Sequence, residues 1–221
     1  MKTIKMIQTN TLKNTKMKNT KMTTTKMKTI TTAFTTVVAA FLLLTNAYGQ
    51  SNDSWKWSVE IDPGTYALNG YSVHVRVQPK NMEHLLVGLG AYAMDMPDLF
   101  VNFNEKNKDM GWNVRINQGL GIFGEYYFDE VNKKWFVGAQ LSLQEFKIEK
   151  TEVTGDQTYT NGLAMAYFGY SIKPFKNNLY FKPWAGMGYT SQMSGSNELQ
   201  GHTYDISPIS MFATLHIGYT F

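Results

Sequence analysis

The residues best suited to chemistry in this sequence are Ser72 and His74, which stand two positions apart in Ser72-Val73-His74. In an extended strand such residues share one face, with Cβ atoms roughly 6 to 7 Å apart. A hydroxyl beside an imidazole can perform acyl transfer when a carboxylate orients the histidine, and Glu60 or Glu125 could supply that carboxylate. The competing interpretation is that these side chains only pack inside the fold.

The same region also predicts a structural polar network. Arg76 continues the spacing of Ser72 and His74, and we expect it to lie at a depth similar to Glu125 and to pair with it. A buried charge without a partner costs several kcal/mol, so interior charges are expected to form pairs. The predicted network comprises Glu60, His74, Arg76, Arg115, Glu125 and His216.

The sequence predicts no metal site and no cofactor. Its four histidines, His74, His84, His202 and His216, lie on separate segments without ligand spacing, and there is no cysteine. The group His202-Tyr204-Asp205 has the composition of a solvated turn.

The elements that must position these residues are strands, because apolar and polar residues alternate with a period of two. Eight segments show this alternation. Their approximate bounds are 55–61, 70–78, 85–94, 111–128, 135–149, 158–172, 178–191 and 206–221. Pro183 lies inside the seventh segment, where it predicts a bulge or a later start, because proline lacks the N–H that a ladder needs.

The connections between these segments alternate in length, which predicts an all-β, eight-stranded antiparallel up-and-down transmembrane barrel. Connections after the second, fourth and sixth segments are short, and the longest of the others runs from Asp95 to Met110. Short turns at one end and long loops at the other are typical of bacterial outer-membrane barrels. A soluble β-sandwich or lipocalin-like barrel is the alternative, but several segments exceed the usual five to six residues of soluble strands.

Alternation also predicts which residues face outward, toward lipid. On the fourth segment these include Trp112, Val114 and Ile116, and on the sixth they are Leu163, Met165 and Tyr167. Aromatic residues near the segment ends are expected to form two interfacial girdles. The predicted girdle residues are Trp55, Trp57, Tyr126, Phe128, Trp135 and Tyr219 at one end and Trp112, Tyr159 and Tyr189 at the other.

The chain ends on an alternating strand whose last residue is aromatic. Gly218, Tyr219 and Phe221 form the assembly signature, with Tyr219 and Phe221 on the apolar face. This terminus resembles the closing strand of bacterial outer-membrane barrels, which the β-barrel insertion machinery reads. The resemblance implies that the machinery is a partner.

Residues 1–49 are predicted to be a low-complexity leader and a secretory signal peptide. They contain eight lysines and no acidic residue before an apolar run at 37–44, which is too short to cross a bilayer as a helix. Ala47-Tyr48-Gly49 fits a signal-peptidase site, so cleavage near Gly49 would leave residues 50–221 as the barrel domain. Translation could begin at Met1 or at Met27.

The charge balance argues against nucleic-acid binding. The whole chain has 21 basic and 17 acidic residues, but eight of the basic residues lie in the leader. Residues 50–221 therefore have 13 basic and 17 acidic residues, a net charge of −4. A nucleic-acid-binding domain would need a basic patch in its folded part.

As architecture, residues 51–221 resemble the small outer-membrane β-barrel family that includes OmpX-like and OmpA-transmembrane-like proteins. Gly218-Tyr219-Thr220-Phe221 is the sharpest motif of that resemblance. It implies a bacterial outer-membrane location and outer-membrane lipids as partners, but the fold hosts adhesins, anchors and lipid A-modifying enzymes alike.

Two functions therefore remain open. The first is a structural or surface-interaction role without catalysis, in which loop 95–110, with Leu99, Phe100 and Phe103, contacts an extracellular ligand. The alternative is a lipid A deacylase-like enzyme, which Ser72, His74 and Glu60 or Glu125 resemble in residue type. Against it, the family has the order His-x-Ser, and alternation turns Ser72 inward.

Overall fold

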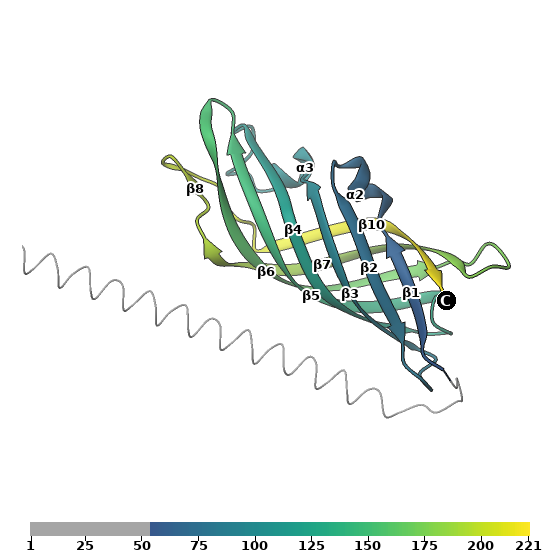
Figure 1. Ribbon diagram of the computed structural model, residues 1–221. Coiled ribbons are helices and arrows are strands. Elements are labelled where there is room, and N and C mark those ends of the chain that lie inside the picture. The colour runs from purple at the N-terminus through teal and green to yellow at the C-terminus, as the bar shows by residue number, and fades with distance from the viewer. Residues whose placement is uncertain (1–53) are drawn as a thin grey trace, which may run out of the picture. The chain divides into compact units, whose positions relative to one another are not determined.

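The alternating segments form the strands of a barrel, shown in Figure 1 for the computed structural model, which describes residues 54–221. The barrel strands are β1 (Lys56–Ile61), β2 (Tyr71–Gln78), β3 (Leu85–Asp95), β4 (Trp112–Tyr127), β5 (Lys134–Lys150), β6 (Val153–Ser171), β7 (Leu179–Gly195) and β10 (Ile209–Thr220). The predicted leader, its apolar run at 37–44 and the cleavage site at Gly49 lie outside the described residues.

Every strand pairs antiparallel with its neighbours, and the sheet closes on itself in the order β1-β10-β7-β6-β5-β4-β3-β2. The closing pair aligns Ser58 with Thr220 and Ile61 with Ile217. Closure removes the unpaired edges that an open sheet would expose. The prediction of an eight-stranded antiparallel barrel is confirmed.

The two ends of the barrel differ. At the turn side, residues 79–84, 128–133 and 172–178 connect the strands briefly. At the loop side, the connections carry α2 (Pro63–Ala67), α3 (Asp98–Val101) and a small hairpin of β8 (Glu198–Leu199) and β9 (His202–Thr203). Figure 1 shows α2 and α3 at the same end.

The short helices were not expected from the sequence, although α2 has a clear start signal. The Asp62 side chain accepts a hydrogen bond from the Gly64 N–H at 2.8 Å, and Pro63 occupies the first turn. Neither α2 nor α3, the helices within residues 54–221, is long and apolar enough to cross a membrane.

β6 begins earlier than predicted. It starts at Val153 instead of residue 158, and only Thr151 and Glu152 turn the chain back from β5. Thr154, Gly155 and Asp156 are all exposed, so polarity does not alternate there even though the backbone is a strand. The period-two signal vanishes where neither face of the hairpin is buried.

Pro183 requires neither a bulge nor a later strand start, so that prediction was wrong. β7 begins at Leu179, and its register with β10 runs unbroken through Pro183, which lies opposite Leu215. Phe181 exchanges both backbone hydrogen bonds with Ile172. The backbone nitrogen of Pro183, two residues further on, therefore also faces β6. The missing N–H interrupts that ladder locally, between the pairs Ile172–Phe181 and Gly169–Trp184.

The outward assignment of the loop-side half of β4 was also wrong. Trp112, Val114 and Ile116 are buried inside the barrel, whereas Arg115 points away. The register with β5 shifts between Ile116 and Gln118, which marks a β-bulge. One extra residue reverses which face each following residue occupies, so the inward set changes there from even to odd positions.

On β6 the whole predicted outer face is instead the inner face. Leu163, Met165 and Tyr167 are about 5 to 6% exposed, while Phe168 is 58% exposed. Tyr159, a predicted girdle residue, is likewise buried. The inward side chains of this strand are as apolar as the outward ones, so polarity could not distinguish the faces.

Elsewhere the outer surface is a belt of exposed apolar side chains from the barrel strands. They include Val59, Val73, Val75, Leu89, Leu120, Val137, Leu143, Phe168, Met187 and Leu215. Toward the turn side, Trp55, Trp57, Tyr126, Phe128, Trp135 and Tyr219 are also exposed. Such a surface is apolar where a soluble barrel would be polar.

Candidate functional site: a divided lumen

Four buried charged residues form a cluster across the turn-side half of the lumen. We call Glu60, Arg76, Glu125 and Lys182 the charge cluster. Their side chains are at most 1% exposed. They come from β1, β2, β4 and β7, so they reach the centre from around the ring.

Lys182 is the centre of this cluster. Its Nζ donates to Glu60 Oε1 at 2.5 Å and to Glu125 Oε1 and Oε2 at 2.9 and 3.0 Å. Arg76 Nε donates to Glu60 Oε2 at 3.1 Å, and Arg76 Nη2 lies 3.7 Å from Glu125 Oε1. Two positive and two negative groups therefore neutralise one another in a site that water does not reach.

Tyrosine and histidine side chains complete the coordination of both carboxylates. Tyr180 donates to Glu60 Oε1 at 2.8 Å, and His216 Nδ1 lies 2.9 Å from Glu60 Oε2. Tyr167 and Tyr127 donate to the two oxygens of Glu125 at 3.1 and 2.9 Å. Each of the four carboxylate oxygens thus has two hydrogen-bond partners, which offsets the cost of burying charge.

Two glycines make room for these side chains. A Cβ at Gly218 would lie 2.2 Å from Tyr180 Cζ, and one at Gly90 would lie 2.2 Å from His74 Nδ1. Any larger residue would therefore displace a ring from the lumen. Gly218, predicted as part of a terminal assembly motif, also has this packing role.

The structure brings Glu60, Arg76, Glu125 and His216 together, with His74 beside them at a ring-centroid distance of 4.7 Å from His216. Arg115 does not belong to this group, and its predicted place is corrected. The β4 bulge turns it outward, where it pairs with Asp95 and donates to the Asn69 carbonyl.

The sequence prediction missed Lys182. Tyr180, Lys182 and Trp184 alternate with Phe181 and Pro183 along β7, and that period-two pattern places the lysine inward.

Ser72 and His74 do form a hydrogen-bonded pair. Ser72 Oγ and His74 Nε2 are 2.8 Å apart, and both side chains are buried. Among residues 54–221, however, no group bonds His74 Nδ1, and Glu60 bonds His216 instead. A hydrolase triad needs the acid on the nucleophile's own histidine, so the geometry supplies a dyad without its orienting acid.

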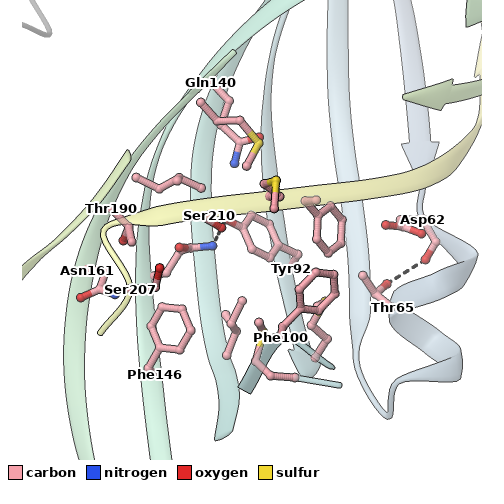
Figure 2. Close-up of a pocket in the computed structure, with 18 of the residues that line it drawn as sticks. Asp62, Thr65, Tyr92, Phe100, Gln140, Phe146, Asn161, Thr190, Ser207 and Ser210 are labelled. Atoms are coloured by element: carbon pink, nitrogen blue, oxygen red, sulfur yellow. Dashed lines mark hydrogen bonds between the residues drawn. The ribbon is translucent and has the colours of Figure 1, made fainter. Parts of the chain in front are cut away.

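On the loop side of the charge cluster, the lumen holds a cavity of about 310 Å³, which we call the loop-side cavity (Figure 2). Its lining is mainly apolar and includes Met94, Phe100, Ile116, Phe146, Leu163, Met165, Trp184 and Phe212. Ser72, His74 and His216 contribute to its lining as well. No lysine or arginine lines it.

On the turn side of the cluster lies a second cavity of about 280 Å³, which we call the turn-side cavity. It is polar and is lined by Lys56, Ser58, Gln78, Glu83, Glu130, Val131, Asn132, Lys173 and Thr220. The two cavities share no lining residue, and the charge cluster lines neither.

Two loops meet at the mouth of the loop-side cavity. Leu99, Phe100 and Phe103 of loop 95–110 line it, and Leu99 is 75% exposed. Asp205 ties this loop to segment 204–208, because its carboxylate accepts hydrogen bonds from Lys106 at 2.9 Å and Asn104 at 2.7 Å. These two contacts lower the pKa of the Asp205 carboxyl below its ordinary 3.8.

No group of three or more histidine, aspartate, glutamate or cysteine residues within residues 54–221 could hold a metal ion. His84 Nδ1 lies within hydrogen-bond distance of the Tyr127 and Asp129 carbonyls, and His202 lies on β9. The histidines outside the lumen are therefore separated from one another.

The terminal motif lies at the turn side of the closing strand. Tyr219 and Phe221 are exposed and their rings meet edge to face at 5.1 Å. The Phe221 N–H donates to the Trp57 carbonyl at 2.8 Å, which continues the β1–β10 pairing to the last residue.

Several solved structures are similar to this chain, and the three described here are at most 14% identical to it. They are the N-terminal β-barrel domain of OprF from Pseudomonas aeruginosa (14% identity, 78% of this chain and 100% of that chain, TM-score 0.43), a major outer membrane protein from Thermus thermophilus (14%, 76% and 100%, TM-score 0.44) and neisserial surface protein A (12%, 75% and 94%, TM-score 0.35). No family model and no curated protein matches. The fold is therefore assigned from the chain's own strand pairing, as a closed eight-stranded antiparallel β-barrel.

Proposed function

We propose that this chain is an integral protein of the bacterial outer membrane with a surface-directed binding role and no open pore. The apolar outer belt and the buried charges in the turn-side half of the interior support insertion, because a soluble barrel would have a polar outer surface. Strands of up to 19 residues are long enough to cross a bilayer while tilted.

The observation that carries the binding role is the divided lumen. The charge cluster closes the turn-side half, whereas a cavity with a mainly apolar lining lies beneath the loops. In an outer-membrane barrel the longer loops face the exterior. The hollow end is then the outer end, where a ligand from outside the cell or from the outer leaflet can reach it.

Two measurements test this proposal. The full chain should fractionate with outer membranes and migrate differently on gels before and after heating, as a folded barrel does. In planar bilayers it should give no steady conductance, because the cluster fills the lumen. Recovery in the soluble fraction, or a stable open channel, would contradict the proposal.

The terminal motif makes a further part of the proposal testable. If the insertion machinery reads Tyr219 and Phe221, deleting Phe221 should lower the amount of heat-modifiable protein in the outer membrane. Phe168→Ala, which removes an exposed aromatic from β6 and leaves the closing strand intact, is the control. Equal assembly of the two variants would remove the insertion machinery from the proposed partners.

A lipid A-modifying hydrolase is the second candidate, and the 2.8 Å contact between Ser72 Oγ and His74 Nε2 favours it. Both residues also line the loop-side cavity. The unpaired His74 Nδ1 argues the other way, since no carboxylate orients the ring. We expect Ser72→Ala and His74→Ala to leave the lipid A profile unchanged by mass spectrometry, and loss of a deacylated species in either variant would favour the enzyme.

A further inference from the structure

We propose that the loop-side cavity binds a neutral, mainly apolar small molecule, which enters between the loops and hydrogen-bonds to the cavity wall. This inference deepens the proposed binding role, because it identifies the site and the chemical class of its ligand.

The size and lining of the cavity set the first limit on the ligand. If each non-hydrogen atom takes roughly the 30 Å³ that a water molecule takes in the liquid, the 310 Å³ cavity holds about ten of them. Three methionines, Met94, Met96 and Met165, contribute to the wall. Their flexible thioethers adapt to ligands of different shape, which suits a chain-like molecule better than one rigid outline.

The charges around the cavity exclude a buried anionic or cationic group. No lysine or arginine lines it, and its single carboxylate, Asp62, is already bonded to Thr214 Oγ1 at 2.7 Å and to the Gly64 N–H. A charge placed in such a site would lose its hydration without gaining a free opposite charge as its partner. The part of the ligand inside the cavity is therefore neutral.

Unpaired polar atoms in the wall identify where the ligand's own polar group binds. Asn161 Oδ1, Thr190 Oγ1 and Trp184 Nε1 are buried and have no hydrogen-bond partner among residues 54–221. Asn161 and Thr190 come from the paired strands β6 and β7, and Figure 2 shows both at one wall of the cavity. Buried polar groups normally have partners, so this wall has the capacity to bind a hydroxyl or carbonyl group.

The mouth provides a route into the cavity. Leu99 and Phe103 line the cavity and are 75% and 52% exposed. They form an apolar rim at the loop side, whereas the charge cluster closes the opposite end. A ligand therefore enters and leaves through the loops.

A photolabelling experiment on the full chain in lipid nanodiscs tests this inference. The probe is a medium-chain primary alcohol carrying a diazirine, and the comparison probe is the carboxylate of the same chain. Crosslinks are mapped by mass spectrometry to inward residues Leu163, Met165 and Phe212 and to outward residues Phe168 and Leu215. Probe dissolved in the bilayer labels the outward residues in every case, which gives an internal reference.

We expect the alcohol to label the inward residues saturably and the carboxylate to label them at least about tenfold less. Labelling of outward residues alone, or equal inward labelling by both probes, would overturn the inference. Because this comparison uses the unaltered chain, it does not depend on whether any variant folds. Failure of labelling in a protein that still inserts into membranes overturns the cavity inference and leaves the proposed location intact.

Two substitutions at one position sharpen the result. Thr190→Trp should fill the cavity and abolish inward labelling, whereas Tyr189→Trp, on the outward neighbour, should not change it. Thr190→Val keeps the shape and removes the hydroxyl, so it should weaken inward labelling by the alcohol several-fold and spare that by a hydrocarbon analogue. Inward labelling that persists in a correctly folded Thr190→Trp would contradict this site.

Discussion

The two halves of the lumen differ in how their interior is filled. The turn-side half is filled by charged side chains that are 0 to 1% exposed and hold one another through many hydrogen bonds. The loop-side half is lined by apolar side chains and leaves about 310 Å³ open. Paired charges fix a single arrangement of the ring of strands, whereas apolar walls tolerate exchange of their contents. The first half suits closure and the second suits binding.

The largest effect should come from Lys182. Lys182→Met leaves two buried carboxylates side by side, and we expect a loss of about 3 to 5 kcal/mol in the free energy of unfolding. Equilibrium denaturation in lipid vesicles measures it. Lys134→Met removes an exposed lysine that pairs with Asp129 at 2.6 Å, and it should change stability by less than about 1 kcal/mol. Similar losses in both variants would mean that the buried cluster contributes no more to the stability of the barrel than an exposed ion pair does.

The second prediction concerns the loop-side half, where the structure places Val114 of β4 inside the barrel. Val114→Trp forces a large ring into a buried position and should cost about 1 to 3 kcal/mol. Asn113→Trp places the same ring on the outside and should be close to neutral. If Asn113→Trp were instead the more destabilising change, Val114 would face outward as alternation predicts, and the β4 bulge would be contradicted.

A smaller difference separates the partners of Arg76 within the cluster. Arg76 is hydrogen-bonded to Glu60 at 3.1 Å but lies 3.7 Å from Glu125. In double-mutant cycles with alanine, the coupling of Arg76 to Glu60 should exceed that to Glu125 by at least about 0.5 kcal/mol. Equal couplings would show that the four charges act as one unit.

The smallest effect concerns the loop clamp at Asp205. Asp205→Asn removes a partly exposed ion pair worth about 0.2 to 1 kcal/mol, so global stability should hardly change. Trypsin should nick loop 95–110 at Lys106 and Lys108 faster than in the control Asp98→Asn. Equal cleavage of the two variants would show that Asp205 does not restrain the loop.

The pH dependence of this clamp follows from the lowered pKa of Asp205. A carboxyl with a depressed folded-state pKa stabilises the fold above its unfolded pKa and loses that contribution as pH falls through the folded value. The clamp should therefore hold at neutral and mildly acidic pH and open only below 3.8. Acid titration of tryptophan fluorescence can follow it, because Trp112 meets Tyr204 of the same segment at 5.6 Å.

The contrast between the halves also explains which features could be predicted from the sequence. Where the outside is apolar and the inside charged, as along Val73, His74, Val75 and Arg76, alternation indicates both strand and face. On β6 both faces are apolar, so the strand was predicted correctly but its inner and outer faces were exchanged. The β4 bulge exchanges the inward and outward positions along the strand, and the alternation pattern does not indicate where such a bulge occurs.

The partners inside the lumen depend on register across the ring, which local spacing does not contain. The contact between Ser72 and His74 follows from their spacing on one strand. Whether Glu60 reaches His74 or His216 depends on β1 and β10 pairing Glu60 with Gly218, at a separation of 158 positions. The link from Asp205 to Asn104 of loop 95–110 likewise joins residues that are 101 positions apart.

The central claim is that the charge cluster separates two cavities, and cysteine accessibility tests it most directly. The chain contains no cysteine, so Ser210→Cys and Thr220→Cys each introduce one thiol at opposite ends of β10, beside the loop-side and turn-side cavities respectively. Each variant is reconstituted in proteoliposomes and treated from outside with a small membrane-impermeant thiol reagent. Trypsin cleavage of loop 95–110 then reports the fraction of molecules with their loops outward.

The account predicts that the labelled fraction of Ser210→Cys equals the fraction with loops outward. The labelled fraction of Thr220→Cys should equal the remainder. Labelling of Thr220→Cys in molecules whose loops face the reagent would contradict the account, because the reagent would then have passed the cluster.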